Sequence, residues 1–360
     1  MIDKMGLQMI RALTIALAAL GLAMASPAAA DSRLFSGEAP LTIVITAPFR
    51  NLVQTAKRST NPYAATLTVT DGVAEPQSIA IQLRARGMTR RTGGYCDFPP
   101  IQLDFGDKAK VHDTLFKGQH KLKLVTYCKD QPEYEQRIVL EYLAYRLYNT
   151  LTPMSFRVRP AEVTYRNSDK EAGVTRFGFL IEDLDDVADR NHAKVLKVPT
   201  KTFTSSQLDP HAAGRTSLFE FLIGNLDWDF LAGPAGLDCC HNAKLVALRV
   251  STPQTAVVPI AYDFDYSGLV DSPYAGPPEG DLPISSVTER LYRGYCVSSG
   301  EIPSIIAEFR AHRAEMMALI NGDPRLNAKF RGKTVRFLDG FFSAVDDPGK
   351  VQSMIIKRCR

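Results

Sequence analysis

The chain has little excess charge of either sign. Its 43 lysines and arginines face 39 aspartates and glutamates, which gives a formal net charge of +4 over 360 residues. The basic residues are dispersed, and the clustered basic surface that marks nucleic-acid-binding proteins is not visible in the sequence. We therefore expect no nucleic acid among its partners.

Several catalytic motifs are absent from the sequence. It has no G-x-S-x-G and no H-E-x-x-H, which are typical of serine hydrolases and zinc proteases. It also has no G-x-G-x-x-G, no V-A-I-K and no H-R-D, the motifs of ordinary protein kinases. These absences exclude a close relationship to ordinary protein kinases and disfavour the other two classes, although a Ser/His/Asp triad assembled only in space stays open.

Long hydrophobic runs are missing beyond the N-terminus. There, Lys4 and Arg11 precede an apolar run over 12–25, and small residues follow at 26–30. This order is typical of a secretory signal peptide, and the run is short for a membrane-spanning helix. We predict that residues 1–30 are a cleaved signal peptide and that the mature protein is extracytoplasmic, periplasmic or secreted, without stable membrane insertion. An uncleaved anchor is the alternative.

Cysteine is scarce, and all six cysteines follow the predicted signal peptide. An even number of cysteines in an exported chain favours disulfide bonds. We predict a bond between Cys96 and Cys128, because both lie in the N-terminal half.

The other four cysteines include an adjacent pair. We expect Cys239 and Cys240 not to bond to each other, because the eight-membered ring would be strained. Bonds to Cys296 and Cys359 are therefore predicted. A metal site that includes His241 is the alternative, although no C-x-x-C pair supports zinc.

The hydrophobic patterning changes along the chain. Alternating apolar residues predict strands in the first half, and spacing at three and four residues predicts a helix over 133–151. The C-terminal part has mainly helical spacing, which predicts an α+β fold. The strands are expected at 41–46, 65–70, 78–86, 100–105, 121–125, 161–166 and 176–182, and the later helices at 217–226, 302–320 and 335–344.

Two apolar runs are followed by acidic residues. The first run leads into Asp227, with Asn242 downstream, and the second leads into Asp263 and Asp265. A carboxylate that orients a hydroxyl, together with an amide and a carboxylate that hold Mg²⁺, is the polar set that phosphoryl transfer needs. The alternative interpretation is that these residues belong to ordinary turns, where Asp and Asn are common.

The surrounding residues resemble a known family. Ile223-Gly224-Asn225-Leu226-Asp227, Asn242 and Tyr262-Asp263-Phe264-Asp265 are similar to motifs of the CotH-type atypical kinases and, more distantly, of HipA-like kinases. The likeness covers roughly residues 78–268. It implies that Asp227 is the catalytic residue, that Asn242 and Asp263 bind Mg²⁺ or Mn²⁺, and that Asp265 assists the metal.

The resemblance also implies a nucleotide site. Arg86 lies in an Arg-Gly segment that suits phosphate binding, and Lys123 is a candidate cation for the phosphates of ATP. Glu141 is the one acid in the apolar run 138–148, so we predict that it pairs with Lys123. Glu135 and Lys121 are substitutes, and a surface position for Lys123 is the alternative.

The implied fold is that of a protein kinase with two lobes. A β-rich N-lobe over 31–183 would hold the nucleotide, and a helical C-lobe over 184–360 would carry the catalytic and metal residues. The implied function is an exported kinase that transfers phosphate from ATP to a Ser or Thr hydroxyl of an unknown protein or small-molecule acceptor. The alternative is an inactive kinase-fold module of the cell envelope, which the long 15-residue step from Asp227 to Asn242 favours.

Overall fold

A computed structural model gives the structure of residues 33–72, 74–107, 111–199, 202–234, 236–248, 257–277 and 282–360. The predicted signal peptide, residues 1–30, lies outside these residues. The described residues belong to one compact unit.

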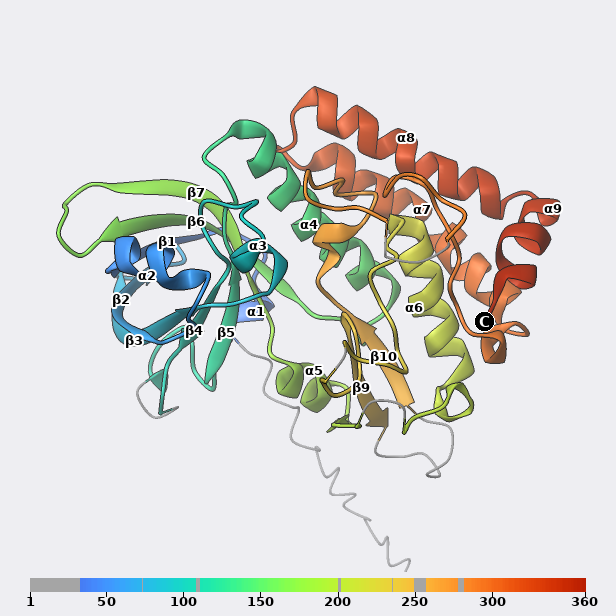
Figure 1. Cartoon of the computed structure of the whole chain (residues 1–360), viewed down its shortest axis with the longest axis horizontal. Helices are drawn as coiled ribbons and strands as arrows, with labels where there is room; N and C mark the ends of the chain where they lie inside the picture. The colour runs from blue at the N-terminus through green and yellow to red at the C-terminus, as the bar shows by residue number, and fades with distance from the viewer. Residues whose placement is uncertain are drawn as a thin grey trace, which may run out of the picture. The chain divides into compact units, whose positions relative to one another are not determined.

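Seven strands close into a barrel in the N-terminal half (Figure 1). Buried and exposed residues alternate along β1, so that one face of each strand fills the barrel interior. The sequence predicts all seven strands, and their existence is confirmed. Their bounds are β1 Leu41–Ala47, β2 Tyr63–Thr70, β3 Gln77–Ala85, β4 Ile101–Asp104, β5 Lys121–Val125, β6 Val158–Asn167 and β7 Gly173–Ile181.

The predicted two-lobed kinase-like fold is wrong. The first half forms a closed barrel in the order β1-β2-β3-β4-β5-β7-β6, not an open sheet. The strands β1 and β6 close it by pairing in parallel from Leu41 opposite Ala161 to Ala47 opposite Asn167, whereas the other neighbouring pairs are antiparallel. Strand periodicity reveals each strand but not which distant strands pair, so the closure was missed.

The later part of the chain combines helices with a second, smaller sheet. The strands β8 (Ala193–Leu196), β9 (Ala243–Leu248) and β10 (Val257–Ala261) form an antiparallel three-stranded sheet in the order β10-β9-β8. The division into 31–183 and 184–360 stays a prediction; Asp183 lies directly after the last barrel strand and caps the next helix through the backbone N–H of Asp185.

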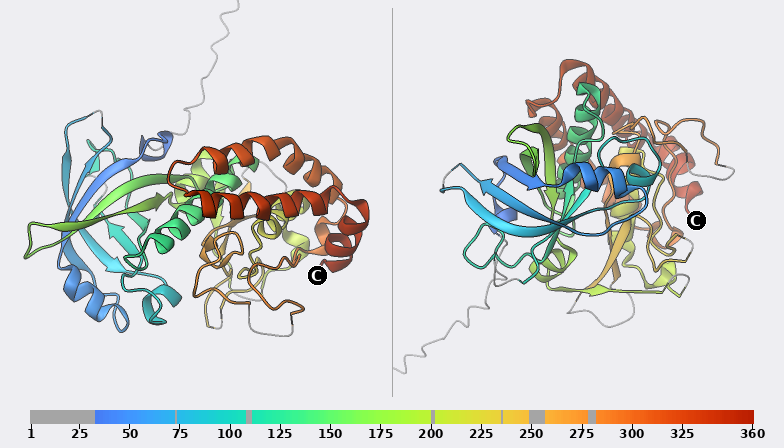
Figure 2. Two further views of the ribbon diagram at one scale, coloured as in Figure 1. Left: turned by 90° about the horizontal axis from the view of Figure 1, so that it is seen from above. Right: turned by 60° about the vertical axis from the view of Figure 1, so that its left-hand side comes forward.

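The helices surround this sheet and cover one side of the barrel. α4 packs against β7 of the barrel and against α7, and α7 lies beside α8, the orange and red pair in Figure 2. The helices predicted at 133–151, 302–320 and 335–344 are confirmed with longer bounds, whereas α6 begins seven residues before 217, at Pro210. The helices are α1 Arg33–Ser36, α2 Phe49–Ala56, α3 Thr89–Thr92, α4 Pro132–Leu151, α5 Leu184–Arg190, α6 Pro210–Ile223, α7 Ile302–Gly322, α8 Ala328–Val345 and α9 Pro348–Lys350.

None of the helices in the described part of the chain is long and apolar enough to cross a membrane. All six cysteines form disulfide bonds. The predicted bond between Cys96 and Cys128 is confirmed.

The prediction for the remaining cysteines is wrong. Cys239 and Cys240 are bonded to each other, and Cys296 is bonded to Cys359. Two backbone hydrogen bonds explain the second pair, because Cys296 N–H donates to the Arg360 carbonyl and Arg360 N–H donates to the Gly294 carbonyl. The C-terminal segment is thereby held beside Cys296, which leaves the adjacent cysteines to each other.

Candidate functional site

One cavity of about 140 Å³ collects most of the residues that the sequence singled out. Residues from seven separate places in the chain line it. Six of the seven predicted site residues are among them: Arg86, Glu141, Asp227, Asn242, Asp263 and Asp265. The seventh, Lys123, is not in its wall.

Asp227 is held by two neighbouring side chains. Its Oδ1 lies 2.6 Å from His241 Nε2, and its Oδ2 accepts a hydrogen bond of 2.9 Å from the Asn242 amide. The hydrogen bond to Asp227 raises the pKa of His241 above its ordinary value, and burial of the ring opposes this rise. Asn242 therefore uses its NH₂ group on Asp227, and its Oδ1 is left as an acceptor or a metal ligand.

The long step from Asp227 to Asn242 is closed by a short antiparallel bridge. Asp229 N–H donates to the His241 carbonyl, and His241 N–H donates to the Asp229 carbonyl, each at 3.0 Å. The intervening residues therefore form a loop that returns to its starting point. This explains how 15 positions of sequence still place Asn242 against Asp227.

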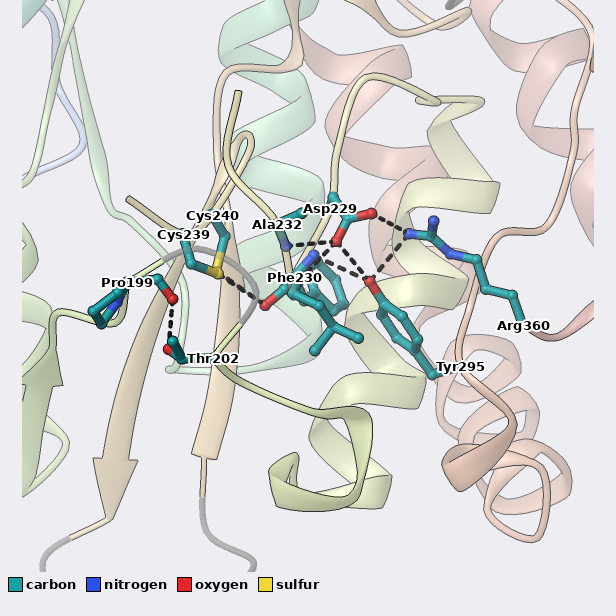
Figure 3. The surroundings of a disulfide bond; sticks show 10 residues. Pro199, Thr202, Asp229, Phe230, Ala232, Cys239, Cys240, Tyr295 and Arg360 are labelled. Carbon is teal, nitrogen blue, oxygen red and sulfur yellow. Dashed lines mark hydrogen bonds and ion pairs between the residues drawn. A yellow bond between two sulfur atoms is a disulfide. The ribbon is translucent and has the colours of Figure 1, made fainter. Parts of the chain in front are cut away.

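The carboxylate of Asp229 organises this loop (Figure 3). It accepts hydrogen bonds from the backbone N–H groups of Leu231 and Ala232 and from the Tyr295 hydroxyl, and it pairs with Arg360 at 2.9 Å. Burial alone would raise the pKa of Asp229, but these hydrogen bonds and the Arg360 charge lower it. Asp229 is thus a structural residue of the loop that presents His241 and Asn242.

The second acidic segment follows β10 directly. Because Ala261 pairs with Ala243 and Tyr262 N–H donates to the Asn242 carbonyl, Asp263 lies next to Asn242. Its backbone N–H donates to the Tyr145 hydroxyl at 2.9 Å. Both Asn242 and Asp263 have a positive φ, +45° and +67°, a conformation that side chains other than glycine adopt rarely and that is found often at functional sites.

Phe264 anchors the two flanking aspartates. Its ring is fully buried and lies 4.6 Å from that of Tyr145 on α4. Asp265 is only 9% exposed and accepts a hydrogen bond from the Tyr274 hydroxyl. Burial, with the nearby charge of Asp263, raises the pKa of Asp265 to about 7.

Glu141 is buried on α4 and faces an arginine. The predicted partner Lys123 is wrong, because Arg90 Nη1 lies 3.8 Å from Glu141 Oε2. Burial, together with the charge of Asp265, raises the pKa of Glu141 well above its ordinary range, and Arg90 opposes this rise. Glu141 Oε2 has no hydrogen-bond partner among the described residues, which leaves it open to a ligand.

Lys123 lies at the side of the site and is half-buried. Its ammonium group sits 4.4 Å from the centre of the Tyr262 ring. Burial, together with the charges of Arg86 and Lys244, lowers the pKa of Lys123 to about 7. The negative charge of Asp263 acts in the opposite direction and raises the pKa of Lys123, so the two side chains are close enough to interact.

Sequence reasoning missed Arg90 and Tyr145 as residues of the site, and it missed the contact of His241 with Asp227. Arg90 stands in the same basic segment as Arg86, but only its burial shows that it is an inward-facing charge. His241 was visible as the neighbour of Asn242. No pattern in the sequence pairs it with Asp227.

The donor groups of the cavity suit a hard divalent cation. Four carboxylates and one amide oxygen face two guanidinium groups, and carboxylate and amide oxygens are the ligands that Mg²⁺ takes in proteins. Burial and the neighbouring charge of Asp263 raise the pKa of Asp265, and a bound cation would oppose both effects. Within the described residues, no group of three or more His, Cys, Asp or Glu side chains forms a metal centre, so a cation would depend on Asn242 or on phosphate oxygens.

No family model matches the chain, and no curated protein matches its sequence. The resemblance to CotH-type proteins therefore stays a prediction.

Proposed function

We propose that the protein is an exported phosphotransferase that moves a phosphoryl group from ATP, with Mg²⁺ or Mn²⁺, to a Ser or Thr hydroxyl of a protein. The observation that carries the proposal is the convergence of six chemically suited residues on one cavity. Its volume of about 140 Å³ has room for a few water-sized groups, which fits a cation and phosphate oxygens. The nucleoside of ATP would lie outside it.

Each residue has a role that follows from its surroundings. Asp227 accepts the proton of the attacking hydroxyl, and His241 and Asn242 hold its carboxylate in one orientation. Asn242 Oδ1, Asp263 and Asp265 hold the cation, which when bound supplies positive charge against the phosphate oxygens. Arg86 lines the cavity with no ion pair among the described residues, so it is free to contact a phosphate.

The export part of the proposal has its own support. The chain has three disulfide bonds, which persist in oxidising compartments, and its N-terminal sequence predicts a signal peptide. We infer a periplasmic or secreted location.

A second candidate is a binding module of the envelope without catalysis. It is favoured by the fact that both oxygens of Asp227 already accept hydrogen bonds, from His241 and Asn242. The two candidates differ in what substitution of Asp227 should do.

The test replaces Asp227 by Asn. Phosphoryl transfer from γ-labelled ATP to a Ser/Thr peptide mixture should fall by about a thousandfold, because the proton acceptor is lost, whereas ATP affinity should stay within about twofold. Asp238→Asn is the matched control, because Asp238 is an exposed loop residue outside the cavity. Unchanged transfer in Asp227→Asn would exclude Asp227 as the base, and no transfer in the wild type would favour the binding module.

A further inference from the structure

A second, basic cavity adjoins the candidate site. It has a volume of about 280 Å³ and lies where the end of α2 meets the α3 segment. Arg90 lines both cavities, so they share one wall residue. Its charged lining is Lys57, Arg90, Arg91 and one carboxylate, Asp97.

Two of the three positive charges of this cavity, those of Lys57 and Arg91, have no acidic partner among the described residues, whereas Arg90 is paired with Glu141. Within the described residues, the Arg91 guanidinium donates to backbone carbonyls alone, those of Ala56 at 2.6 Å and Gly87 at 2.9 Å. Lys57 forms no ion pair within the described part of the chain, and its ammonium group lies beside the backbone of Gly94. With Arg90 balanced by Glu141, the two remaining cations, Lys57 and Arg91, face one carboxylate, Asp97, which leaves a net charge of about +1 for a ligand to meet.

The larger cavity at the barrel rim differs in this respect. Arg146 and Arg190 line it, but Arg146 pairs with Glu38 at 2.7 Å and Arg190 pairs with Glu182 at 3.0 Å. Two of its three arginines are thus paired with carboxylates, and the third, Arg157, also has an interaction partner, so the demand for an anion is lower there.

The walls of the basic cavity are fixed rather than loose. Cys96 lines it and is bonded to Cys128, while Asp97 N–H and Phe98 N–H both donate to the Cys128 carbonyl. The Arg90 guanidinium donates to the Thr126 carbonyl at 2.6 Å in the same region. A preformed site of this kind binds a ligand with a small ordering cost.

Two exposed apolar side chains flank the same segment. Met88 is 69% exposed and Tyr95 is 48% exposed, and they are two of the four large hydrophobic residues exposed in the described part of the chain. They stand immediately before α3 and three residues after it. Met88 lines the candidate site, and Tyr95 stands in the chain between Gly94 and Cys96 of the basic lining. Exposed apolar side chains on the segment that joins the two cavities suit a peptide better than a free inorganic ion.

We propose that this cavity binds an acidic side chain of the protein acceptor, close to the hydroxyl that is phosphorylated. The proposal rests on the proposed function, because it names the acceptor of the same site. A carboxylate and a phosphate group would both suit the basic cavity. A free anion such as inorganic phosphate is therefore the alternative ligand.

The test measures peptide binding to the oxidised protein without ATP or metal. A fluorescent peptide with a serine flanked by glutamates is titrated by anisotropy at about 0.15 M salt, where surface charges beyond about 8 Å are screened. Lys57→Glu should weaken binding by about tenfold or more, because it reverses a charge in the cavity wall. Arg58→Glu is the matched control, since it makes the same charge change one residue along, outside the lining, and should change affinity by less than about twofold.

The outcomes separate the sources of the anion. Binding that falls equally in both variants, or that is no tighter than that of a glutamine-substituted peptide, would overturn the proposal. Inorganic phosphate that binds with dependence on Lys57, while the acidic peptide does not bind, would also overturn it and assign the cavity to a free anion. The proposal is supported if inorganic phosphate displaces the peptide only at a concentration much higher than that of the peptide.

The same variants separate this proposal from the proposed function. Peptide that binds through Lys57 but receives no phosphate from ATP means that the phosphotransferase assignment fails and the acidic-peptide site stands. If Lys57→Glu and the wild type phosphorylate the peptide equally well, the acidic-peptide site fails and the phosphotransferase assignment stands.

Discussion

Arg90 and Glu141 are the buried charged pair on which the candidate site is built. Both side chains are almost fully excluded from solvent, at 7% and 2% exposed. Burial alone would lower the pKa of Arg90, but the nearby acidic groups, Asp263 and Asp265 among them, raise it above its ordinary value. Arg90 therefore balances several acids at once, and removal of either partner leaves an uncompensated charge in the interior.

This arrangement predicts strong coupling between the two residues. Arg90→Met and Glu141→Gln should each lower the free energy of unfolding by about 3 kcal/mol, and the double variant should lose clearly less than the sum. Urea unfolding of the four proteins gives the coupling energy. Strict additivity would mean that the two side chains do not act as a pair.

Among the residues near the site, Lys123 should make the stability of the protein depend most clearly on pH. Its folded-state pKa of about 7 lies below the ordinary value of 10.5, because burial disfavours the charged form. A lowered pKa in a base means that stability is present above pH 10.5 and is lost as the pH falls toward 7. At pH 6, Lys123→Met should be more stable than the wild type by about 1–3 kcal/mol.

The advantage of Lys123→Met should shrink by about pH 9.5, as measured by urea unfolding at both values. Lys121→Met, on the same strand, is the control: the Lys121 side chain is 41% exposed and its ammonium group lies 3.5 Å from Asp104, so the difference should change less with pH. A Lys123→Met difference that does not change with pH would contradict burial as the cause of the lowered pKa.

At the scale of elements, the sequence predicted those whose pattern is local. The barrel strands and α4 follow from alternation or from helical spacing within each segment. α6 was placed too late, because its N-terminal signal, the Asp209 cap followed by Pro210, was not used. α2 was missed because it is a single short helix of eight residues.

The loop 86–98 is the element on which the site depends most. It carries Arg86 and Arg90, and the bond between Cys96 and Cys128 ties its end to the segment after β5. Loss of this bond in Cys96→Ser/Cys128→Ser should lower the free energy of unfolding by about 2–4 kcal/mol and weaken ATP binding.

The bond between Cys296 and Cys359 provides the comparison. Its removal should cost a similar amount of stability but lower ATP affinity less, because this bond reaches the cavity only indirectly, through Arg360 and Asp229, whereas the 86–98 loop supplies Arg86 and Arg90 to the lining. Urea unfolding and ATP titration of both double variants check this. Equal loss of ATP affinity in the two variants would show that the loop has no special role.

At the scale of the whole molecule, the sequence predicted which residues come together but not the strand and loop pairings that bring them together. Asp227, Asn242 and Asp263 were chosen for their chemistry and order, and the structure places them side by side. The barrel closure between β1 and β6 and the bridge between Asp229 and His241 join residues far apart in sequence. Such pairings depend on the packing of the entire chain, so no local pattern reveals them.

We propose above all that the cavity lined by Asp227, Asn242 and Asp263 binds the phosphates of ATP together with a divalent cation. The most direct measurement is thermal unfolding of the oxidised protein with and without ATP and Mg²⁺ or Mn²⁺, beside Asp263→Asn. The account predicts a rise of several degrees in Tm that requires both ATP and the cation and is lost in Asp263→Asn, because a ligand that binds only the folded state stabilises it. No rise in folded wild-type protein, or a rise that Asp263→Asn retains, would contradict it.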